Sequence, residues 1–258
     1  MKQLCSLDNP FKYTVKGFVW EYLKLLQPEK HLDYGCNSAD MISDLADKGY
    51  LIQAYGVDLN REAILSGQKQ APHNVNLQSI EKGKPLPFGD NSFDSISIIG
   101  VLEHIADQKS ILGELRRILK PQGQLIICVP GKYIFSFLDI GNFKFVFPRL
   151  HKRVYSLIHS SKQYHERYVQ CKNGLFGDIE VEKMWHQHFS ENEMAALLNQ
   201  ENFEVIQYDG AGFFNRILLM INLLMLPPFK VLWKRLINLD YKLFSKMELI
   251  CVAKKLSL

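Results

Sequence analysis

Residues 31–36 place an acid and a glycine where an apolar run ends and a helical pattern begins. The run His31-Leu32-Asp33-Tyr34-Gly35-Cys36 has the order of a ligand loop at the carboxyl edge of a parallel sheet. A loop that holds a pyrophosphate needs several glycines so that its backbone can approach the phosphates, and this loop contains only Gly35. The segment therefore disfavours a dinucleotide as ligand.

A second acid, Asp58, ends the next expected strand, 23 residues after Gly35. A carboxylate at this place in a doubly wound fold accepts hydrogen bonds from ribose hydroxyls, while Asp33 would lie near a cationic amino or sulfonium group. One glycine turn, two acids and no phosphate cradle indicate a cationic nucleoside. The structural alternative is that Asp33 caps the following helix and that Asp58 is a solvated loop acid.

The elements that must position these residues alternate along the first 130 residues. Strands are expected at 31–34, 51–57, 75–78, 93–99 and 124–129, and helices at 11–26, 39–48, 61–68 and 108–119. This alternation predicts right-handed crossovers and a doubly wound α/β sheet.

The pattern changes after Pro130. Residues 131–184 are aromatic and basic without a clear period, which indicates an insertion or lid. Ser190 and Glu193 have the spacing of a capping box and begin a helix. A strand at 203–208, an apolar helix at 213–236 and a strand at 248–253 are expected to follow. We therefore divide the chain into 1–130, 131–189 and 190–258.

Five motifs in order carry a resemblance to a known family. They are Leu32-Asp33-Tyr34-Gly35-Cys36, Gly56-Val57-Asp58, Leu86-Pro87-Phe88-Gly89-Asp90-Asn91-Ser92-Phe93-Asp94, Val101-Leu102-Glu103-His104-Ile105, and Glu114 to Gly123. Together they resemble the class I S-adenosylmethionine-dependent methyltransferases, in their small-molecule branch, over roughly residues 28–130. The resemblance implies a seven-stranded, mostly parallel Rossmann-like sheet with a cap inserted after the fifth strand.

The resemblance also implies S-adenosylmethionine as cofactor and a role for each matching position. Asp33, Gly35 and Cys36 would line its methionine part, Asp58 would hold the ribose, Leu59, Ser79 and Ile80 would surround the adenine, and Ile99 and Gly100 would lie beneath the sulfonium. The family usually has glycines where this chain has Asn37 and Ala39, and often an acid in place of Ser79. These departures leave a cofactor-binding regulatory subunit without catalysis as an alternative.

Two histidines are candidates for a catalytic base. His104 follows the fourth expected strand, where the transferred methyl should lie, and His186 belongs to Trp185-His186-Gln187-His188. A hydroxyl acceptor would need such a base, whereas a nucleophilic acceptor would need mainly alignment. The structural alternatives are that His104 braces its loop and that this pair of histidines only packs. No matching Cys or carboxylate pair accompanies them, so no metal site is expected.

Charge is unevenly distributed along the 258 residues, whose net charge is +4. Residues 1–130 carry 14 basic and 15 acidic side chains, and residues 131–258 carry 17 and 12. The basic residues concentrate in the insertion, where Arg149, Arg153 and Tyr164 are candidates to bind an acceptor that bears phosphate or carboxylate. Nucleic acid is disfavoured because the total charge is small and no binding module is recognisable.

Residues 217–233 are nearly all apolar, with cations around them and no acid between Arg216 and Leu239. Two interpretations stay open for 213–236: a buried helix pair, or a helix that lies on an anionic membrane surface. A basic insertion beside an apolar region favours an amphiphilic acceptor, such as a lipid-linked or surface-polysaccharide precursor, with a quinone or other lipid as the rival.

Composition and cysteine usage bound the class and the compartment. The 47% of apolar residues excludes disorder, and the five scattered cysteines exclude a disulfide scaffold. We expect no signal peptide and a cytoplasmic protein, with peripheral contact at the inner face of a membrane as the alternative. The oligomeric state stays open.

Overall fold

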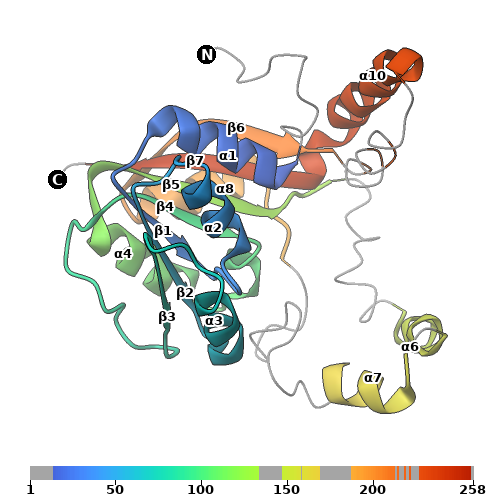
Figure 1. The fold of residues 1–258 in the computed structure, drawn as a ribbon, viewed down its shortest axis with the longest axis horizontal. Helices are drawn as coiled ribbons and strands as arrows, with labels where there is room; N and C mark the ends of the chain where they lie inside the picture. Colours follow the sequence, from blue (N-terminus) through green and yellow to red (C-terminus); the bar gives the residue numbers. More distant parts are fainter. Residues whose placement is uncertain are drawn as a thin grey trace.

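The computed structural model describes residues 14–133, 147–157, 159–168, 187–212 and 227–256, with single positions at 214, 218 and 221. A sheet of seven strands forms its centre, in the order β3-β2-β1-β4-β5-β7-β6 (Figure 1). Strands β1 to β5 run parallel to one another, and β7 runs antiparallel to both β5 and β6. The predicted seven-stranded, mostly parallel doubly wound sheet is confirmed.

The strands have the following bounds: β1 Lys30–Tyr34, β2 Gln53–Asp58, β3 Val75–Ser79, β4 Phe93–Ile99, β5 Leu119–Pro130, β6 Phe203–Ala211 and β7 Glu248–Lys255. The α-helices are α1 Val15–Leu26, α2 Asp40–Asp47, α3 Arg61–Gln68, α4 Gln108–Ile118, α6 Pro148–Ser156, α7 Ser161–Tyr168, α8 Glu191–Gln200 and α10 Pro227–Phe244. The described residues also include the short 3-10 helices η2 Leu102–His104 and η5 Ser245–Met247.

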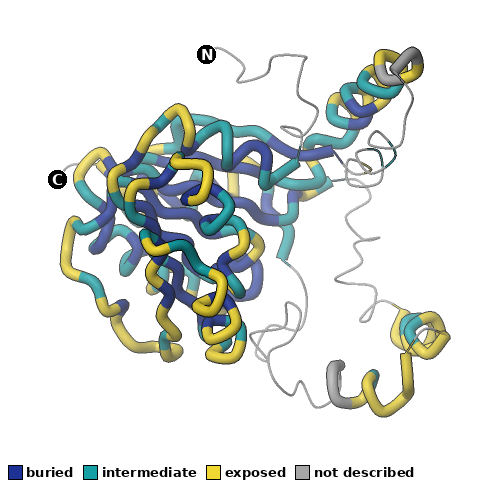
Figure 2. The backbone as a smooth tube through the Cα atoms, in the orientation of Figure 1, coloured by how far each residue is buried: buried dark blue, intermediate teal, exposed yellow. Residues whose placement is uncertain are grey.

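Two apolar layers cover the two faces of the sheet. Helices α1, α2 and α3 bury residues such as Leu23, Ile42 and Ile64 on one face. Helices α4 and α8 bury residues such as Leu115 and Leu198 on the other. The buried strands between these layers form the continuous dark core in Figure 2. Because both faces are covered, the carboxyl edge of the parallel strands is where polar groups can gather.

The second half of the chain departs from expectation in the bounds of one helix. Within the described residues of 131–184, α6 and α7 lie apart from the sheet in Figure 1, and the role of this segment as an insertion or lid stays a prediction. The helix expected to end at 236 continues, as α10, from Pro227 to Phe244. The two prolines begin this helix rather than interrupt it, since proline is well suited to the first helical turn. Most of 213–226 lies outside the described residues.

The chain leaves the core after β5 and returns to the same place. Gly131 forms a parallel bridge with Phe189, and the amide of Lys132 donates to the Phe189 carbonyl over 2.8 Å. This contact joins the two ends of the intervening segment, as an insertion requires. The division at 131 and 189 stays a prediction. Within the described part of the chain, no helix combines the length and apolarity needed to cross a bilayer.

Candidate functional site

The loop between β1 and α2 adopts a backbone that normally requires glycine. Gly35 has a φ of +79°, and a Cβ at this position would overlap a methyl group of Val101. Asn37 and Ala39 also have positive φ angles, of 52° and 61°. Asn tolerates this region, whereas alanine is strained there by about 1–2 kcal/mol. The loop therefore keeps its sharp turn without the usual glycines.

Asp58 ties this loop to the end of β2. Its Oδ2 accepts from the amide of Asn37 over 2.8 Å, and its Oδ1 accepts from the amide of Asn60 over 2.7 Å. The side chain is buried, so the interpretation of Asp58 as a solvated loop acid is wrong. Each carboxylate oxygen has a second lone pair, which leaves acceptor capacity for a ligand.

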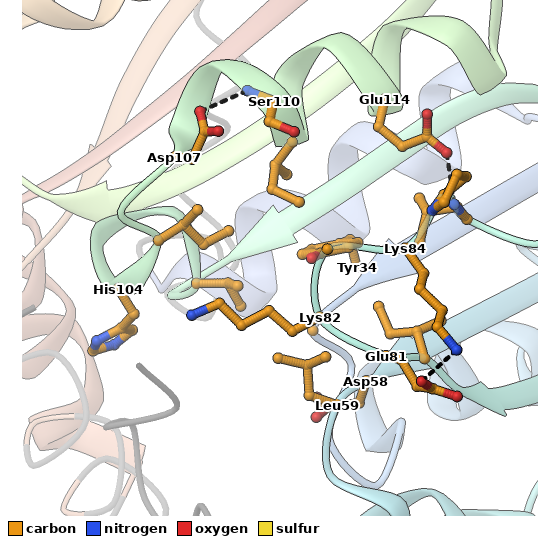
Figure 3. A pocket seen from close by; sticks show the side chains of 18 of the residues that line it. Tyr34, Asp58, Leu59, Glu81, Lys82, Lys84, His104, Asp107, Ser110 and Glu114 are labelled. Carbon is orange, nitrogen blue, oxygen red and sulfur yellow. Dashed lines mark hydrogen bonds and ion pairs between the residues drawn. The ribbon is translucent and has the colours of Figure 1, made fainter. Parts of the chain in front are cut away.

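A pocket of about 330 Å³ opens beside Asp58 at the carboxyl edge of the sheet. Five of the residues expected to contact cofactor or substrate line it together: Gly35, Asp58, Leu59, Ile80 and His104. Figure 3 shows His104 on one side of the opening and Asp58 and Leu59 on another. The spatial convergence of these positions agrees with the expected site, although their individual roles stay predictions.

The other expected cofactor residues lie near this pocket without lining it. Ser79 is paired in register with Asp58, and the amide of Ile80 donates to the Asp58 carbonyl. Ile99 ends β4, and Gly100 follows it with a φ of +66°. Cys36 is buried, and burial raises the pKa of its thiol. A high thiol pKa makes a nucleophilic role for Cys36 unfavourable, so its expected place is structural or in contact with the cofactor.

Asp33 lies at the end of a buried chain of hydrogen bonds. The hydroxyl of Ser97 donates to Oδ1 of Asp33 over 2.6 Å, and Nε2 of His31 lies 3.0 Å from that hydroxyl oxygen. Nδ1 of His31 lies 2.7 Å from the hydroxyl of Ser95. Asp33 therefore contacts β4 and does not cap α2, whose first residue follows Ala39.

The ionisation of this chain follows from its burial. Burial lowers the pKa of His31 to about 3, so the imidazole is neutral. Because the Ser97 hydroxyl donates to Asp33, its oxygen accepts from Nε2–H of His31, and Nδ1 then accepts from Ser95. Burial raises the pKa of Asp33 to about 7, although the hydrogen bond from Ser97 opposes the rise. The dipoles of the chain thus point toward the carboxyl group of Asp33.

His104 lies in the 3-10 helix η2, directly after β4. Its side chain is buried at the pocket wall, and Nε2 lies 3.9 Å from Oε1 of the neighbouring Glu103. Burial raises the pKa of the Cys128 thiol, and the nearby carboxylates of Glu248 and Glu103 raise it further. The thiol of Cys128 lies 3.6 Å from Oε2 of Glu248. Glu103 was not among the expected site residues, and its place beside His104 in the sequence was the signal that could have indicated it.

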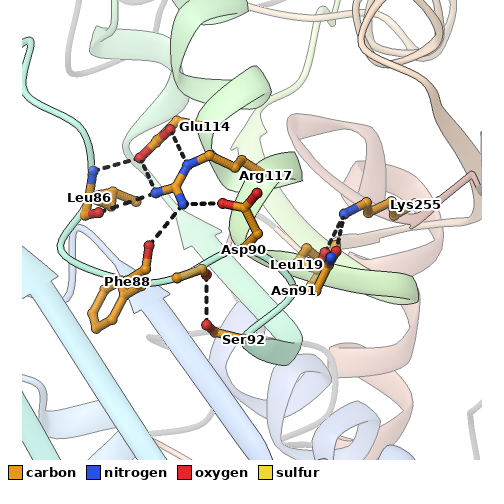
Figure 4. Close-up of polar contacts among 10 residues, drawn as sticks. Leu86, Phe88, Asp90, Asn91, Ser92, Glu114, Arg117, Leu119 and Lys255 are labelled. Atoms are coloured by element: carbon orange, nitrogen blue, oxygen red, sulfur yellow. Dashed lines mark hydrogen bonds and ion pairs between the residues drawn. The ribbon is translucent and has the colours of Figure 1, made fainter.

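The loop between β3 and β4 forms one wall of the pocket and is held by Arg117 of α4 (Figure 4). The guanidinium donates to both carboxylate oxygens of Glu114, over 2.9 and 2.7 Å, and to Oδ1 of Asp90 over 2.7 Å. It also donates to the carbonyls of Phe88 and Leu86. The motif from Leu86 to Asp94 is therefore structural, and it fixes the residues that precede it.

Several residues of this wall were not expected from the sequence. They are Glu81, Lys82, Gly83, Lys84 and Pro85 from the loop, and Asp107, Ser110 and Ile111 from the beginning of α4. Figure 3 shows Lys82 extending between Leu59 and His104. The position of this loop directly after Ile80 was the available signal, because residues that follow a parallel strand lie at the ligand edge.

The expected acceptor residues lie elsewhere. Arg149 is exposed on α6, and Arg153 lies one turn later on the same helix. Tyr164 on α7 has its hydroxyl 3.2 Å from Nδ1 of His151. None of the three lines the pocket at Asp58, so their role in acceptor binding stays a prediction. His186 lies outside the described residues.

A second pocket of about 460 Å³ lies at the same edge, over the ends of β5, β6 and β7. Its lining includes Lys132, Glu191, Tyr208, Tyr241 and Glu248. The end of β5 separates this pocket from the end of β4, because β5 pairs with β4 on one side and with β7 on the other. The edge therefore offers two spaces, one beside the acid of β2 and one toward α10.

Known proteins resemble this chain in sequence. The demethylmenaquinone methyltransferase of Staphylococcus saprophyticus is 31% identical over 141 residues, which are 52% of this chain and 60% of that protein. The enzyme of the same name from Listeria welshimeri is 32% identical over 158 residues, with 54% and 62% covered. The chain thus spans about three fifths of the length of these curated relatives.

Solved structures share the fold at low sequence identity. A putative methyltransferase of Haloferax volcanii, in complex with the Trm112 methyltransferase activator, has a TM-score of 0.58 at 16% identity, covering 96% of this chain and 91% of its own. A SAM-dependent methyltransferase from Methanosarcina mazei has a TM-score of 0.52 at 20% identity, covering 90% and 94%. The expected resemblance to class I methyltransferases is confirmed in fold and family. Since residues 13–208 match the family described as a methyltransferase domain, the chain belongs to that family.

Proposed function

We propose that this chain is an S-adenosylmethionine-dependent methyltransferase that acts on an amphiphilic acceptor. The observation that carries the proposal is the convergence of Gly35, Asp58, Leu59, Ile80 and His104 on one pocket at the carboxyl edge of the sheet. Membership of the methyltransferase domain family supports the same activity.

The residues present fit a nucleoside without phosphates. Gly35 lets the loop backbone pack against Val101 at the pocket wall, Leu59 and Ile80 offer apolar surface for a base, and Asp58 keeps acceptor capacity for hydroxyls. The loop lacks the set of glycines that a pyrophosphate needs. When bound, S-adenosylmethionine supplies an electrophilic methyl group on a sulfonium.

The chain's own residues would align the reactants and hold charge. Asp33, when ionised, provides the negative charge that a cationic ligand needs at the end of β1. For a hydroxyl acceptor, His104 would take the proton as the acceptor oxygen forms its bond to the methyl carbon and the sulfur–carbon bond breaks. For a carbon or nitrogen acceptor that is already nucleophilic, alignment and exclusion of water would suffice.

A quinone-type acceptor with a lipid tail is the finer proposal. It is supported by the printed name of the curated relatives, which are demethylmenaquinone methyltransferases, and by the apolar surface of α10 beside the second pocket. A lipid-linked precursor with an anionic headgroup is the second candidate, favoured by the exposed cations of α6.

Calorimetric titration with S-adenosylmethionine, followed by a labelled-methyl assay, tests the proposal. Asp58→Ala should weaken cofactor binding by about 2–4 kcal/mol. Asp58→Asn keeps the shape of the side chain but presents an NH2 group to one of the two backbone amides, so it should also weaken binding, by less than Asp58→Ala. We expect label transfer to demethylmenaquinone in mixed micelles. Transfer only to a lipid-linked sugar would favour the second candidate, and binding without any transfer would favour a regulatory subunit.

A further inference from the structure

A stripe of large apolar side chains on α10 faces solvent. Phe229, Leu232, Leu236, Leu239 and Leu243 are between 38% and 58% exposed. They follow one another at intervals of three and four residues, which places them on one side of the helix. Figure 2 shows this helix projecting from the core with much of its surface exposed. We call these five residues the α10 stripe.

A neighbouring side of α10 holds the helix to the protein. Ile237 and Asp240 are buried, and Oδ1 of Asp240 accepts from the amide of Phe214 over 3.0 Å. Nε1 of Trp233 donates to the carbonyl of Leu218 over 2.7 Å. One side of α10 therefore packs against the protein, and the α10 stripe lies outside the core.

The charges around the α10 stripe have one sign. Arg235 and Lys242 on the helix and Lys246 just after it are exposed cations. Asp240 is the only acid in the sequence of α10, and its side chain is buried. An apolar stripe bordered by cations is the pattern of a helix that lies in the interface of an anionic membrane.

A second helix repeats this pattern. Phe147, Leu150, Val154 and Leu157 are exposed large apolar residues at intervals of three, four and three along α6. Arg149, Lys152 and Arg153 on the same helix are exposed, and α6 contains no acid. Ten of the fifteen exposed large apolar residues in the described ranges belong to α6 with its flanks or to α10.

We propose that α10 docks this protein on an anionic lipid surface. A second copy of the chain is the competing occupant. A symmetric interface through α10 would bring Arg235 and Lys242 of one copy near the same cations of the other, without an exposed acid on the helix to offset them. An anionic bilayer instead complements both the apolar stripe and its cations.

The docked helix would bring the second pocket to the membrane. Tyr241 near the end of α10, Lys246 of η5 and Glu248 at the beginning of β7 all line that pocket. A lipid acceptor could then reach the carboxyl edge of the sheet without crossing water. This last step rests on the proposed function, whereas the docking itself does not.

Flotation of the full chain with vesicles tests the docking. The probes are vesicles of phosphatidylcholine mixed with phosphatidylglycerol, and vesicles of phosphatidylcholine alone. We expect flotation with the anionic vesicles. Leu232→Ser, Leu236→Ser and Leu239→Ser combined should reduce the partition by about tenfold or more. The matched control is Leu25→Ser, Ile52→Ser and Leu65→Ser, which removes equally exposed leucine and isoleucine side chains from the core domain and should leave flotation unchanged.

Variants that reverse charge test the role of the cations in vesicle binding separately from that of the apolar groups. Arg235→Glu with Lys242→Glu should abolish the preference for anionic vesicles. Cofactor titration of every variant separates docking from the proposed activity, since a folded variant keeps its cofactor affinity while losing flotation. The proposal is overturned if the native chain floats with neither vesicle, or if the core controls lose flotation equally. A dimer in sedimentation that dissociates in the leucine variants, without vesicle binding, would identify a second copy as the occupant.

Discussion

The carboxyl group of Asp33 lies where two opposing effects meet. Burial favours its neutral form, while the hydroxyl of Ser97 stabilises its ionised form, and the net result is a pKa of about 7. A cation bound at the end of β1 would be attracted only by the ionised form. Asp33 therefore makes cofactor binding depend on pH near neutrality, if it faces the cationic part of the cofactor.

We expect the affinity for S-adenosylmethionine to rise as pH increases from 5 to 7 and to level off above the pKa of about 7. Asp33→Asn should remove most of this dependence. Ser97→Ala removes the hydrogen bond that lowers the pKa of Asp33, so it should move the midpoint of the affinity profile upward. Calorimetric titration across this pH range measures both effects. A profile that is identical in Asp33→Asn would place the cation elsewhere.

The carboxyl group of Asp33 affects the stability of the fold with the opposite pH dependence: cofactor affinity should rise with pH, whereas stability should fall. The pKa of Asp33 is raised in the folded protein from 3.8 to about 7, so the folded state binds its proton more tightly than the unfolded state between these values. The contribution of Asp33 to the free energy of unfolding is therefore fully present below pH 4 and is lost as pH rises toward 7. The pKa of His31 is lowered to about 3, so its contribution is complete above pH 6.5 and is lost as pH falls.

Relative to the native chain, Asp33→Asn should therefore gain stability as pH rises from 4 to 7. The expected gain is on the order of 1 kcal/mol per pH unit in the free energy of unfolding. Urea unfolding at pH 5 and pH 7 measures the difference between the two proteins, which cancels the titration of all other groups. Parallel pH profiles for the two proteins would show that the pKa of Asp33 is ordinary.

At the level of single residues, part of the site could be predicted from the sequence. Asp58 and Gly35 could be predicted because their chemistry and their places at strand ends are both visible along the chain. The partners of Asp33 could not, because they depend on the register of β1 against β4. That register pairs His31 with Ser95 and Asp33 with Ser97, across 64 residues of sequence.

Among the elements, α4 supports the pocket through a single guanidinium. Arg117 joins Glu114 and Asp90 to the carbonyls of the loop that precedes β4, and its pKa is raised chiefly by the hydrogen bonds to Glu114 and Asp90. The residues just before this clamp line the pocket. Arg117 is thus a positioning residue for the wall that faces Asp58.

Arg117→Ala should destabilise the protein by about 1–3 kcal/mol and should also weaken cofactor binding. Arg117→Lys keeps the charge but cannot reproduce the forked contacts, so it should restore little of either property. Thermal unfolding and calorimetric titration measure the two effects, and Arg116→Ala on the same helix is the control. Full cofactor affinity in a folded Arg117→Ala protein would show that the loop keeps its place without the clamp.

Element boundaries were predictable where local chemistry marks them. The capping box of Ser190 and Glu193 is present, and α8 begins there. The same kind of signal was missed at α7, where the amide of Gln163 donates to the Ser160 hydroxyl and the amide of Ser160 donates to Oε1 of Gln163. The end of α10 was wrong because the apolar run stops before Asn238 and Asp240, whereas the helix continues past these residues to Phe244.

For the whole molecule, net charge and apolar surface divide between two parts. The cofactor pocket lies in the part where basic and acidic residues are nearly balanced, while the exposed apolar stripes lie in the basic part. The family fold accounts for the first part. The second part carries the exposed apolar stripes of α6 and α10, and α10 lies beyond the residues 13–208 that match the family. Two separable functions, cofactor binding and surface docking, are the consequence we infer.

Salt should separate these two functions. Raising the ionic strength from about 0.05 M to about 0.5 M shortens the screening length from more than 10 Å to less than 8 Å, which weakens attraction between exposed cations and an anionic surface. Binding at the buried Asp58 is screened much less. We therefore expect vesicle partition to fall by about tenfold or more while cofactor affinity changes little.

Flotation and calorimetric titration across one salt series measure vesicle partition and cofactor affinity. The double variant Arg235→Glu with Lys242→Glu is the control, because its vesicle partition should no longer fall with salt. Equal losses of partition and affinity would mean that the basic part and the cofactor pocket act as one electrostatic unit, and the separation inferred from the charge distribution would then be wrong.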